Sequence, residues 1–211
     1  MKYIRKNSEP KALLDLKAFE NEDWKPSWSD LYGEEKNAVK ASLMSEQGHI
    51  CCYCERRLTE SDSHIEHFRP QSDPLVDPLD YANMLCSCQK NLNKGEPRHC
   101  GNLKDDWFDA DQLISPIEPN CENRFRYMYD GCIRPFRKTD AAAEKTISKL
   151  GLGIPKLNRL RAKAIDPFLD EALTEEELNL FVIGYLEPDL EGRFSEFWTT
   201  IRQLFYESRA A

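Results

Sequence analysis

The stretches CCYC at residues 51–54 and HIEHFRP at residues 64–70 decide the fold of this chain. Cys51 and Cys54 are separated by two residues, which is the spacing of a knuckle that places two thiolates on one metal ion. All four histidines and six of the eight cysteines fall between positions 49 and 100. This clustering indicates a metal-stapled module, and the imidazole and carboxylate groups of residues 64–70 indicate a catalytic centre within it.

The sequence has no feature of a membrane or secreted protein. Its apolar runs fall short of the roughly 18 residues that span a bilayer, and its start, MKYIRK at residues 1–6, lacks the apolar stretch of a signal peptide. We therefore expect a cytoplasmic protein with no membrane partner. Because the cytoplasm is reducing, the clustered cysteines are expected to bind metal, while Cys121 and Cys132 are expected to be ordinary thiols.

The negative charge of the chain is concentrated near its end. The formal net charge is −8, and residues 170–211 hold ten acidic and three basic side chains. Since phosphate binding relies on lysine and arginine, this end of the chain is poorly suited to bind nucleic acid by itself. The acidic segment is either a surface for a basic partner or simply a solvated helical face.

Local patterns predict more helix than strand. Apolar residues at helical spacing, followed by Gly48, predict a helix over residues 34–46 that leads into the knuckle. Residues 49–69 are predicted to form a β-hairpin with a polar turn at 59–63, and the next ordered segment starts at 81–85. Further helices are predicted over residues 11–19, 141–150, 156–168, 174–186 and 193–208.

Several motifs occur together in a characteristic order. After the knuckle come Glu66-His67-x-x-Pro70, then Asn83, then Cys88, and finally CGNLK at residues 100–104. In this order, over roughly residues 45–106, the chain resembles the HNH nucleases, whose fold is the ββα-metal module. The cysteines of the last two elements resemble the closing cysteine pair of that family.

The resemblance implies an α+β fold, in which a zinc-stapled ββα-metal module is flanked by N-terminal helices and a C-terminal helical domain. It implies a structural Zn²⁺ held by four thiolates, with His49, Cys86 or His99 as alternative ligands. The predicted domains are an N-terminal arm and helix at 1–47, the HNH module at 48–110, a connecting segment at 111–135 and an acidic helical domain at 136–211. The four predicted zinc ligands are Cys51, Cys54, Cys88 and Cys100.

Phosphodiester hydrolysis requires an activated water and stabilisation of the charge that develops at phosphorus and on the departing oxygen. His67 is predicted to be the general base, because a neutral imidazole is available near pH 7. The resemblance implies that Glu66 holds a catalytic Mg²⁺ or Mn²⁺ and that Asn102 is the second metal-side residue. It implies that Asn83 braces the loop and orients His67, and His64 is a further candidate ligand for metal or phosphate.

The wider chain resembles the HNH proteins that accompany an ATPase, namely the nuclease subunits of Septu-type antiphage systems and of certain retrons. This implies the effector subunit of a defence complex, with an ABC-type ATPase partner docked on residues 136–211. The expected substrate is nucleic acid, with DNA favoured and RNA such as tRNA left open; the alternative function is a zinc-binding adaptor without catalytic activity. The candidate phosphate contacts are Arg56, Arg57, Arg69, Lys90, Lys94, Arg98 and Lys104.

Overall fold

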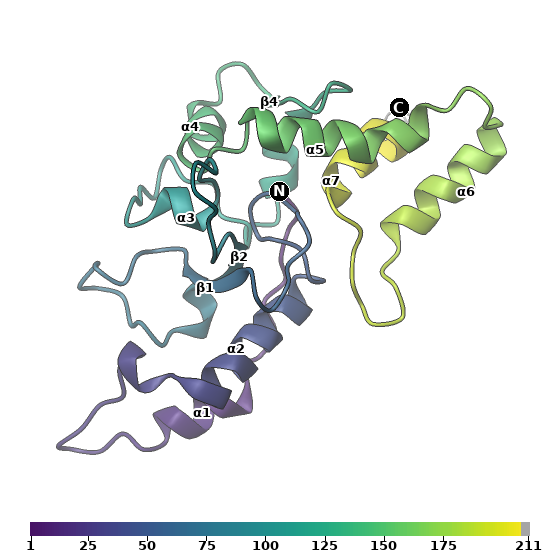
Figure 1. Cartoon of the computed structure of the whole chain (residues 1–211). Helices are drawn as coiled ribbons and strands as arrows, with labels where there is room; N and C mark the ends of the chain where they lie inside the picture. The colour runs from purple at the N-terminus through teal and green to yellow at the C-terminus, as the bar shows by residue number, and fades with distance from the viewer. Residues whose placement is uncertain (208–211) are drawn as a thin grey trace.

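The computed structural model describes residues 1–207, which form the predicted α+β fold of helices and two small sheets (Figure 1). At the N-terminal end, α1 (Lys11–Lys17) lies beside α2 (Gly33–Glu46), and a short 3₁₀ turn at Trp28–Asp30 precedes α2. Both helices were predicted from the sequence, and α2 ends just before Gly48, as expected. Because α2 buries Val39 and Leu43, it anchors the start of the knuckle on the core.

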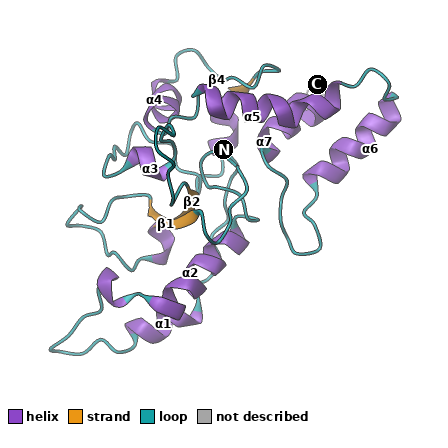
Figure 2. Ribbon diagram, viewed as in Figure 1, coloured by secondary structure: helices purple, strands orange, loops and turns teal. Residues whose placement is uncertain are grey.

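The central sheet consists of two antiparallel strands, β1 (Ser63–His67) and β2 (Met84–Cys88), drawn in orange in Figure 2. Every residue of β2 is buried, and the short helix α3 (Gly101–Lys104) contacts that strand. The Gln47 side chain, at the end of α2, donates to the Cys86 carbonyl at 2.9 Å and accepts from the Cys86 amide at 2.7 Å. These bonds pair the free edge of β2 with the end of the helix.

The predicted β-hairpin over residues 49–69 is wrong. Residues 50–57 close a tight turn through a single bridge between Ile50 and Arg57, while β1 pairs with β2 in the register Glu66↔Leu85. The first half of the expected hairpin instead forms the turn that holds Cys51 and Cys54, so it cannot pair with β1. The apolar strand β2 then becomes the better partner for β1.

The apolar side chains form two clusters. The first combines the N-terminal helices, the knuckle and the central sheet with α4 (Ala141–Lys149) and the start of α5 (Pro155–Ile165). The second joins the end of α5 to α6 (Glu175–Leu186), α7 (Trp198–Ile201) and the π-helical turn Arg202–Tyr206. A second small sheet pairs β3 (Phe125–Tyr127) with β4 (Ile133–Pro135). The boundaries of the four domains remain predictions, because two packing clusters do not show where a domain begins or ends.

The segment before α7 returns to the knuckle. The Phe194 amide donates to the Gly48 carbonyl at 2.9 Å, and the Thr199 amide donates to the buried Glu55 carboxylate at 2.7 Å. Residues 193–197 therefore do not form the helix that was predicted, because the Phe194 and Phe197 amides donate to the carbonyls of Gly48 and Glu55 instead. Ser208, the end of that predicted helix, lies outside the described residues. In the described part of the chain, every helix is too short or too polar to cross a membrane.

Gly48 supplies a test of this packing. Its φ is +61°, and a Cβ added there would overlap the ring of Phe194, whereas Gly192, with φ of +74°, has no atom within 4 Å of that position. We expect Gly48→Ala to lower the free energy of unfolding by about 3 kcal/mol, because strain and overlap add, and Gly192→Ala to lower it by about 1 kcal/mol. Urea unfolding of the two variants measures this difference. Equal losses would contradict the packing of Phe194 on the end of α2.

Candidate functional site

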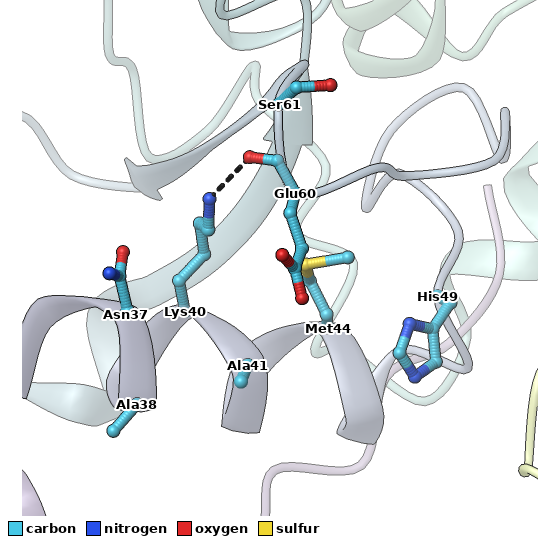
Figure 3. Close-up of a pocket in the computed structure, with 8 residues that line it drawn as sticks. All are labelled: Asn37, Ala38, Lys40, Ala41, Met44, His49, Glu60 and Ser61. Carbon is cyan, nitrogen blue, oxygen red and sulfur yellow. Dashed lines mark hydrogen bonds between the residues drawn. The ribbon is translucent and has the colours of Figure 1, made fainter. Parts of the chain in front are cut away.

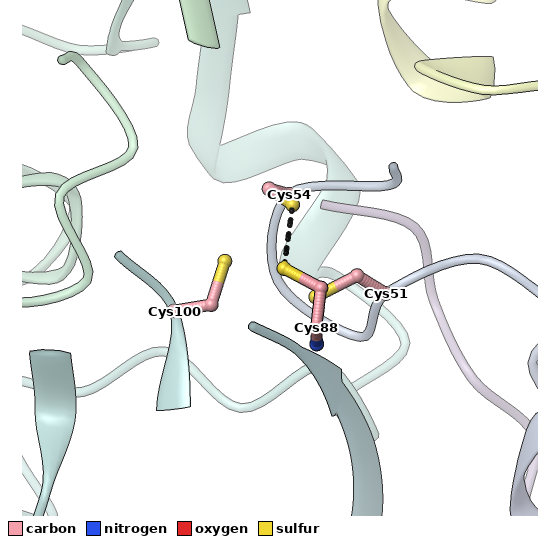
Figure 4. Close-up of side chains that lie close together, drawn as sticks. All are labelled: Cys51, Cys54, Cys88 and Cys100. Carbon is pink, nitrogen blue, oxygen red and sulfur yellow. Dashed lines mark hydrogen bonds between the residues drawn. The ribbon is translucent and has the colours of Figure 1, made fainter. Parts of the chain in front are cut away.

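Four cysteine thiols meet in the interior of the module (Figure 4). The Sγ atoms of Cys51, Cys54, Cys88 and Cys100 all lie within 4.8 Å of one another, and all four residues are buried. The Cys54 and Cys88 sulfurs are 3.7 Å apart. Thiolates bound tetrahedrally at about 2.3 Å from one Zn²⁺ stand about 3.8 Å apart, so the cluster can hold a metal ion such as zinc.

Three separate elements supply the cluster. The tight turn after α2 supplies Cys51 and Cys54, the end of β2 supplies Cys88, and Cys100 precedes α3 with φ of +56°. The Cys88 amide donates to Cys51 Sγ at 3.4 Å, so the backbone also satisfies a thiolate. Burial raises the pKa of Cys51, but hydrogen bonds from its neighbouring cysteines, first among them Cys100, more than offset this and hold the pKa well below normal.

The alternative zinc ligands lie outside this cluster. His99 is buried beside it, with Nδ1 at 3.1 Å from Cys100 Sγ and 3.7 Å from Cys88 Sγ. Cys86 is buried on the same strand as Cys88, and burial raises its pKa to about 12. His49 lines a different cavity of about 630 Å³ between α2 and residues 60–61 (Figure 3). Glu60 also lines that cavity, together with Lys40, which donates to the Glu60 carbonyl at 2.7 Å.

The predicted acid–histidine pair lies on β1, beside a hollow of about 300 Å³. As strand alternation requires, His64 and Glu66 share one side, with His64 Nε2 at 3.7 Å from Glu66 Oε2. The strand thus brings together three of the predicted site residues, His64, Glu66 and His67. The hollow is lined by these three residues and by Ile65, Pro70, Gln71, Gly101, Lys104, Asp105 and Asp106.

His67 is held in one tautomer. Its Nε2 lies 2.9 Å from the Pro78 carbonyl, which can only accept, so Nε2 carries the proton. Its Nδ1 is 2.9 Å from the Gln71 side-chain amide and accepts from it, and the Trp28 ring packs edge-on at 4.6 Å. Burial lowers the pKa of His67, so the ring is neutral near pH 7.

The two carboxylate oxygens of Glu66 have different surroundings. Its Oε1 accepts from the Tyr53 hydroxyl at 3.1 Å and pairs with Lys104 Nζ at 3.0 Å. Its Oε2 faces His64 and Gly101, and a Cβ added at Gly101 would overlap that oxygen and lie 3.0 Å from His64 Nε2. The space beside Oε2 therefore depends on glycine. Lys104 was a candidate phosphate contact, but its ammonium is buried against Glu66.

The two predicted asparagines lie outside this hollow. Asn83 accepts from the Arg69 amide at 2.8 Å and donates to the Arg69 carbonyl at 2.9 Å, which ties the loop after β1 to the start of β2. Asn102 turns away from Glu66 and donates to the Gln89 carbonyl at 3.0 Å. Its Oδ1 is buried without a hydrogen-bond partner among residues 1–207. The functional roles of both asparagines remain predictions.

Three residues of the site were missed by sequence reasoning, although two of them had a signal in the sequence. Tyr53 lies between two cluster cysteines, so its burial beside the metal site could have been expected. Gln71 directly follows the acid–histidine motif, and its side chain was within reach of His67. Trp28 is far from the motif in sequence, and nothing local indicates that it packs on His67.

The site thus combines two antiparallel strands and a short helix with an acid–histidine strand beside a four-cysteine cluster. Two known proteins similar to the chain are named as HNH endonucleases. "Retron Vc95 putative HNH endonuclease" of Vibrio cholerae serotype O1 biovar El Tor is 32% identical over 138 residues, 62% of this chain and 65% of the relative. "Retron Ec83 putative HNH endonuclease" of Escherichia coli is 24% identical over 212 residues, 80% of each chain.

A third relative, the Septu protein PtuB of Bacillus thuringiensis, is 24% identical over 162 residues, 76% of this chain and 57% of the relative. The matched region spans just under two thirds of the first relative's length. No protein-family model matches the chain. The resemblance inferred from the motifs, to the HNH proteins of retrons and Septu systems, is confirmed by these three relatives.

The cluster can be tested with two cysteines of the same strand. We expect Cys88→Ala to lose its bound zinc and to unfold at lower temperature, because metal binding is coupled to folding in such sites. Cys86→Ala should keep one zinc per chain, since Cys86 lies outside the cluster. Metal analysis and thermal melting measure both effects. Equal zinc content in the two variants would show that Cys88 is not a ligand.

Proposed function

We propose that this chain is a metal-dependent HNH endonuclease that hydrolyses phosphodiester bonds. The observation that carries the proposal is the arrangement on β1, where His67 is oriented by a backbone carbonyl and Glu66 lies beside His64 in the lining of the same hollow. The names of two relatives, both retron HNH endonucleases, support the same activity. A zinc staple alone does not need an oriented neutral histidine beside a carboxylate.

In the proposed reaction, His67 Nδ1 takes a proton from the attacking water, because Nε2 already carries the proton bonded to Pro78. The Gln71 amide, which occupies the Nδ1 lone pair, must move aside for that water. The water oxygen forms its bond to phosphorus as the bond to the 3′ oxygen breaks. His67 then returns its proton to solvent and regains the neutral form.

The donor set of Glu66 and His64 fits one divalent ion. Two ligands bound at about 2.1 Å stand about 3 Å apart when adjacent and about 4 Å apart when opposite. Oε2 and Nε2 are 3.7 Å apart, between these two values, so a small rotation of either side chain lets both bind one ion. We assign Glu66 and His64 as holding Mg²⁺ or Mn²⁺, which when bound stabilises charge on the phosphate and the departing oxygen. Asn83 fixes the loop that carries Pro78 and Gln71, and Asn102 anchors α3 to residue 89.

We further propose that the chain is the effector subunit of a cytoplasmic antiphage complex with an ABC-type ATPase. The surface of α6 supports the proposal of a protein partner. Leu180 and Ile183 on this helix are 65% and 45% exposed, and the helix begins with acidic residues. Such an apolar face on an acidic helix suits docking better than contact with nucleic acid. The proposed substrate is DNA, with RNA such as tRNA as the alternative.

The deciding experiment is cleavage of plasmid, single-stranded DNA, tRNA and total RNA with Mg²⁺ or Mn²⁺, by the protein alone and with any ATPase that co-purifies. We expect His67→Ala to lower cleavage at least about 1,000-fold by removing the base. His49→Ala is the matched control, because His49 lines a separate cavity, and it should cleave like the wild type. If His67→Ala and the wild type behave alike, the chain is a zinc-bound adaptor instead.

A further inference from the structure

We propose that Tyr53 and Lys104 are positioning residues that clamp one oxygen of Glu66, so that the other oxygen is presented to the catalytic ion beside His64. This inference rests on the proposed function. It assigns a specific task to the knuckle: the cysteine cluster would fix the position of Tyr53, and Tyr53 would fix the position of the Glu66 carboxylate. Neither residue touches the reacting atoms; each acts through Glu66.

The clamp on Glu66 Oε1 has two arms, which are the side chains of Tyr53 and Lys104. The Tyr53 arm comes from the knuckle itself. Tyr53 lies between Cys52 and Cys54 and is 1% exposed, and its hydroxyl donates to Glu66 Oε1 at 3.1 Å. Because Cys54 belongs to the four-cysteine cluster, the backbone on one side of Tyr53 is fixed by any ion bound there. The position of the phenol is therefore set by the metal site and not by the surface.

The Lys104 arm comes from α3. Its Nζ lies 3.0 Å from Glu66 Oε1 and donates to the His67 carbonyl and the Asp105 carbonyl, each at 3.1 Å. These three oxygens use all three donors of the ammonium group. Since α3 begins directly after Cys100, this arm is also fixed at its base by the cluster.

The two arms leave Glu66 asymmetric. Oε1 receives the phenol and the ammonium, whereas Oε2 lies 3.7 Å from His64 Nε2. The terminal torsion of glutamate is broad, and an unclamped carboxylate would sample many orientations. The clamp removes that freedom, and glycine at position 101 keeps the space beside Oε2 open.

The clamp also lowers the entropy cost of using a glutamate as a metal ligand. Glutamate has one more rotatable bond than aspartate, so it loses more conformational entropy when it becomes an ordered ligand. Two fixed donors on Oε1 restrict the side chain before the ion binds. Second-sphere partners of this kind commonly change metal affinity by 10- to 100-fold when they are removed.

The test is titration of the zinc-loaded full chain with MnCl₂, followed by calorimetry. Glu66→Gln should abolish binding at this site, which locates the ion. Tyr53→Phe removes only the hydroxyl and should weaken Mn²⁺ binding about tenfold while one zinc per chain is retained. Tyr81→Phe is the matched control, because its buried hydroxyl bonds Ser42 and Glu46 away from the hollow, and it should bind Mn²⁺ like the wild type.

A double-mutant cycle separates positioning from general packing. Glu66→Asp shortens the carboxylate beyond reach of the phenol, so adding Tyr53→Phe should cause little further loss of Mn²⁺ affinity. Fully additive losses, unchanged binding in Tyr53→Phe, or loss of zinc from that variant would each overturn the clamp. Failure of the proposed function is distinguishable, because Glu66→Gln would then bind Mn²⁺ as the wild type does.

Discussion

The meeting of four thiols at one point is the constraint on which the rest of the structure depends. Cys51 and Cys54 fix the turn after α2, Cys88 fixes the end of β2, and Cys100 fixes the start of α3. Buried thiolates repel one another unless an ion neutralises them, so a bound metal would stabilise all three elements at once. With these ends fixed, β1 finds its partner in β2, and α3 is held against the side of β1 that carries Glu66.

The site follows from this frame and from the alternation of a strand. His64 and Glu66 share the side that faces α3, while the ring of His67 is held between Pro78, Gln71 and Trp28. All three residues line one hollow, in which His64 and Glu66 are suited to hold a cation and His67 to accept a proton. The division explains why a carboxylate and a histidine adjacent in sequence can perform separate tasks without pairing with each other.

The sequence predicted those features that depend on spacing. The cysteine spacing, the order of the motifs and the helical periods led to the cluster, to Glu66 with His67, and to α2 and α4–α6. Features that depend on which way a side chain points were missed. In the short α3 it is Gly101, not Asn102, that faces Glu66, and Lys104 looked like a surface base although burial makes it an internal donor. The partner of β1 was misassigned because local patterns do not show which strand is most buried.

X-ray absorption at the zinc edge of the purified chain tests the four-cysteine site directly, because it identifies the atoms bound to the ion. Four buried thiolates predict one zinc per chain with four sulfur neighbours at about 2.3 Å and no nitrogen. The nearest competitor is His99, whose Nδ1 lies 3.1 Å from Cys100 Sγ. A nitrogen neighbour in the spectrum, or protein that folds without bound metal, would contradict the four-cysteine staple.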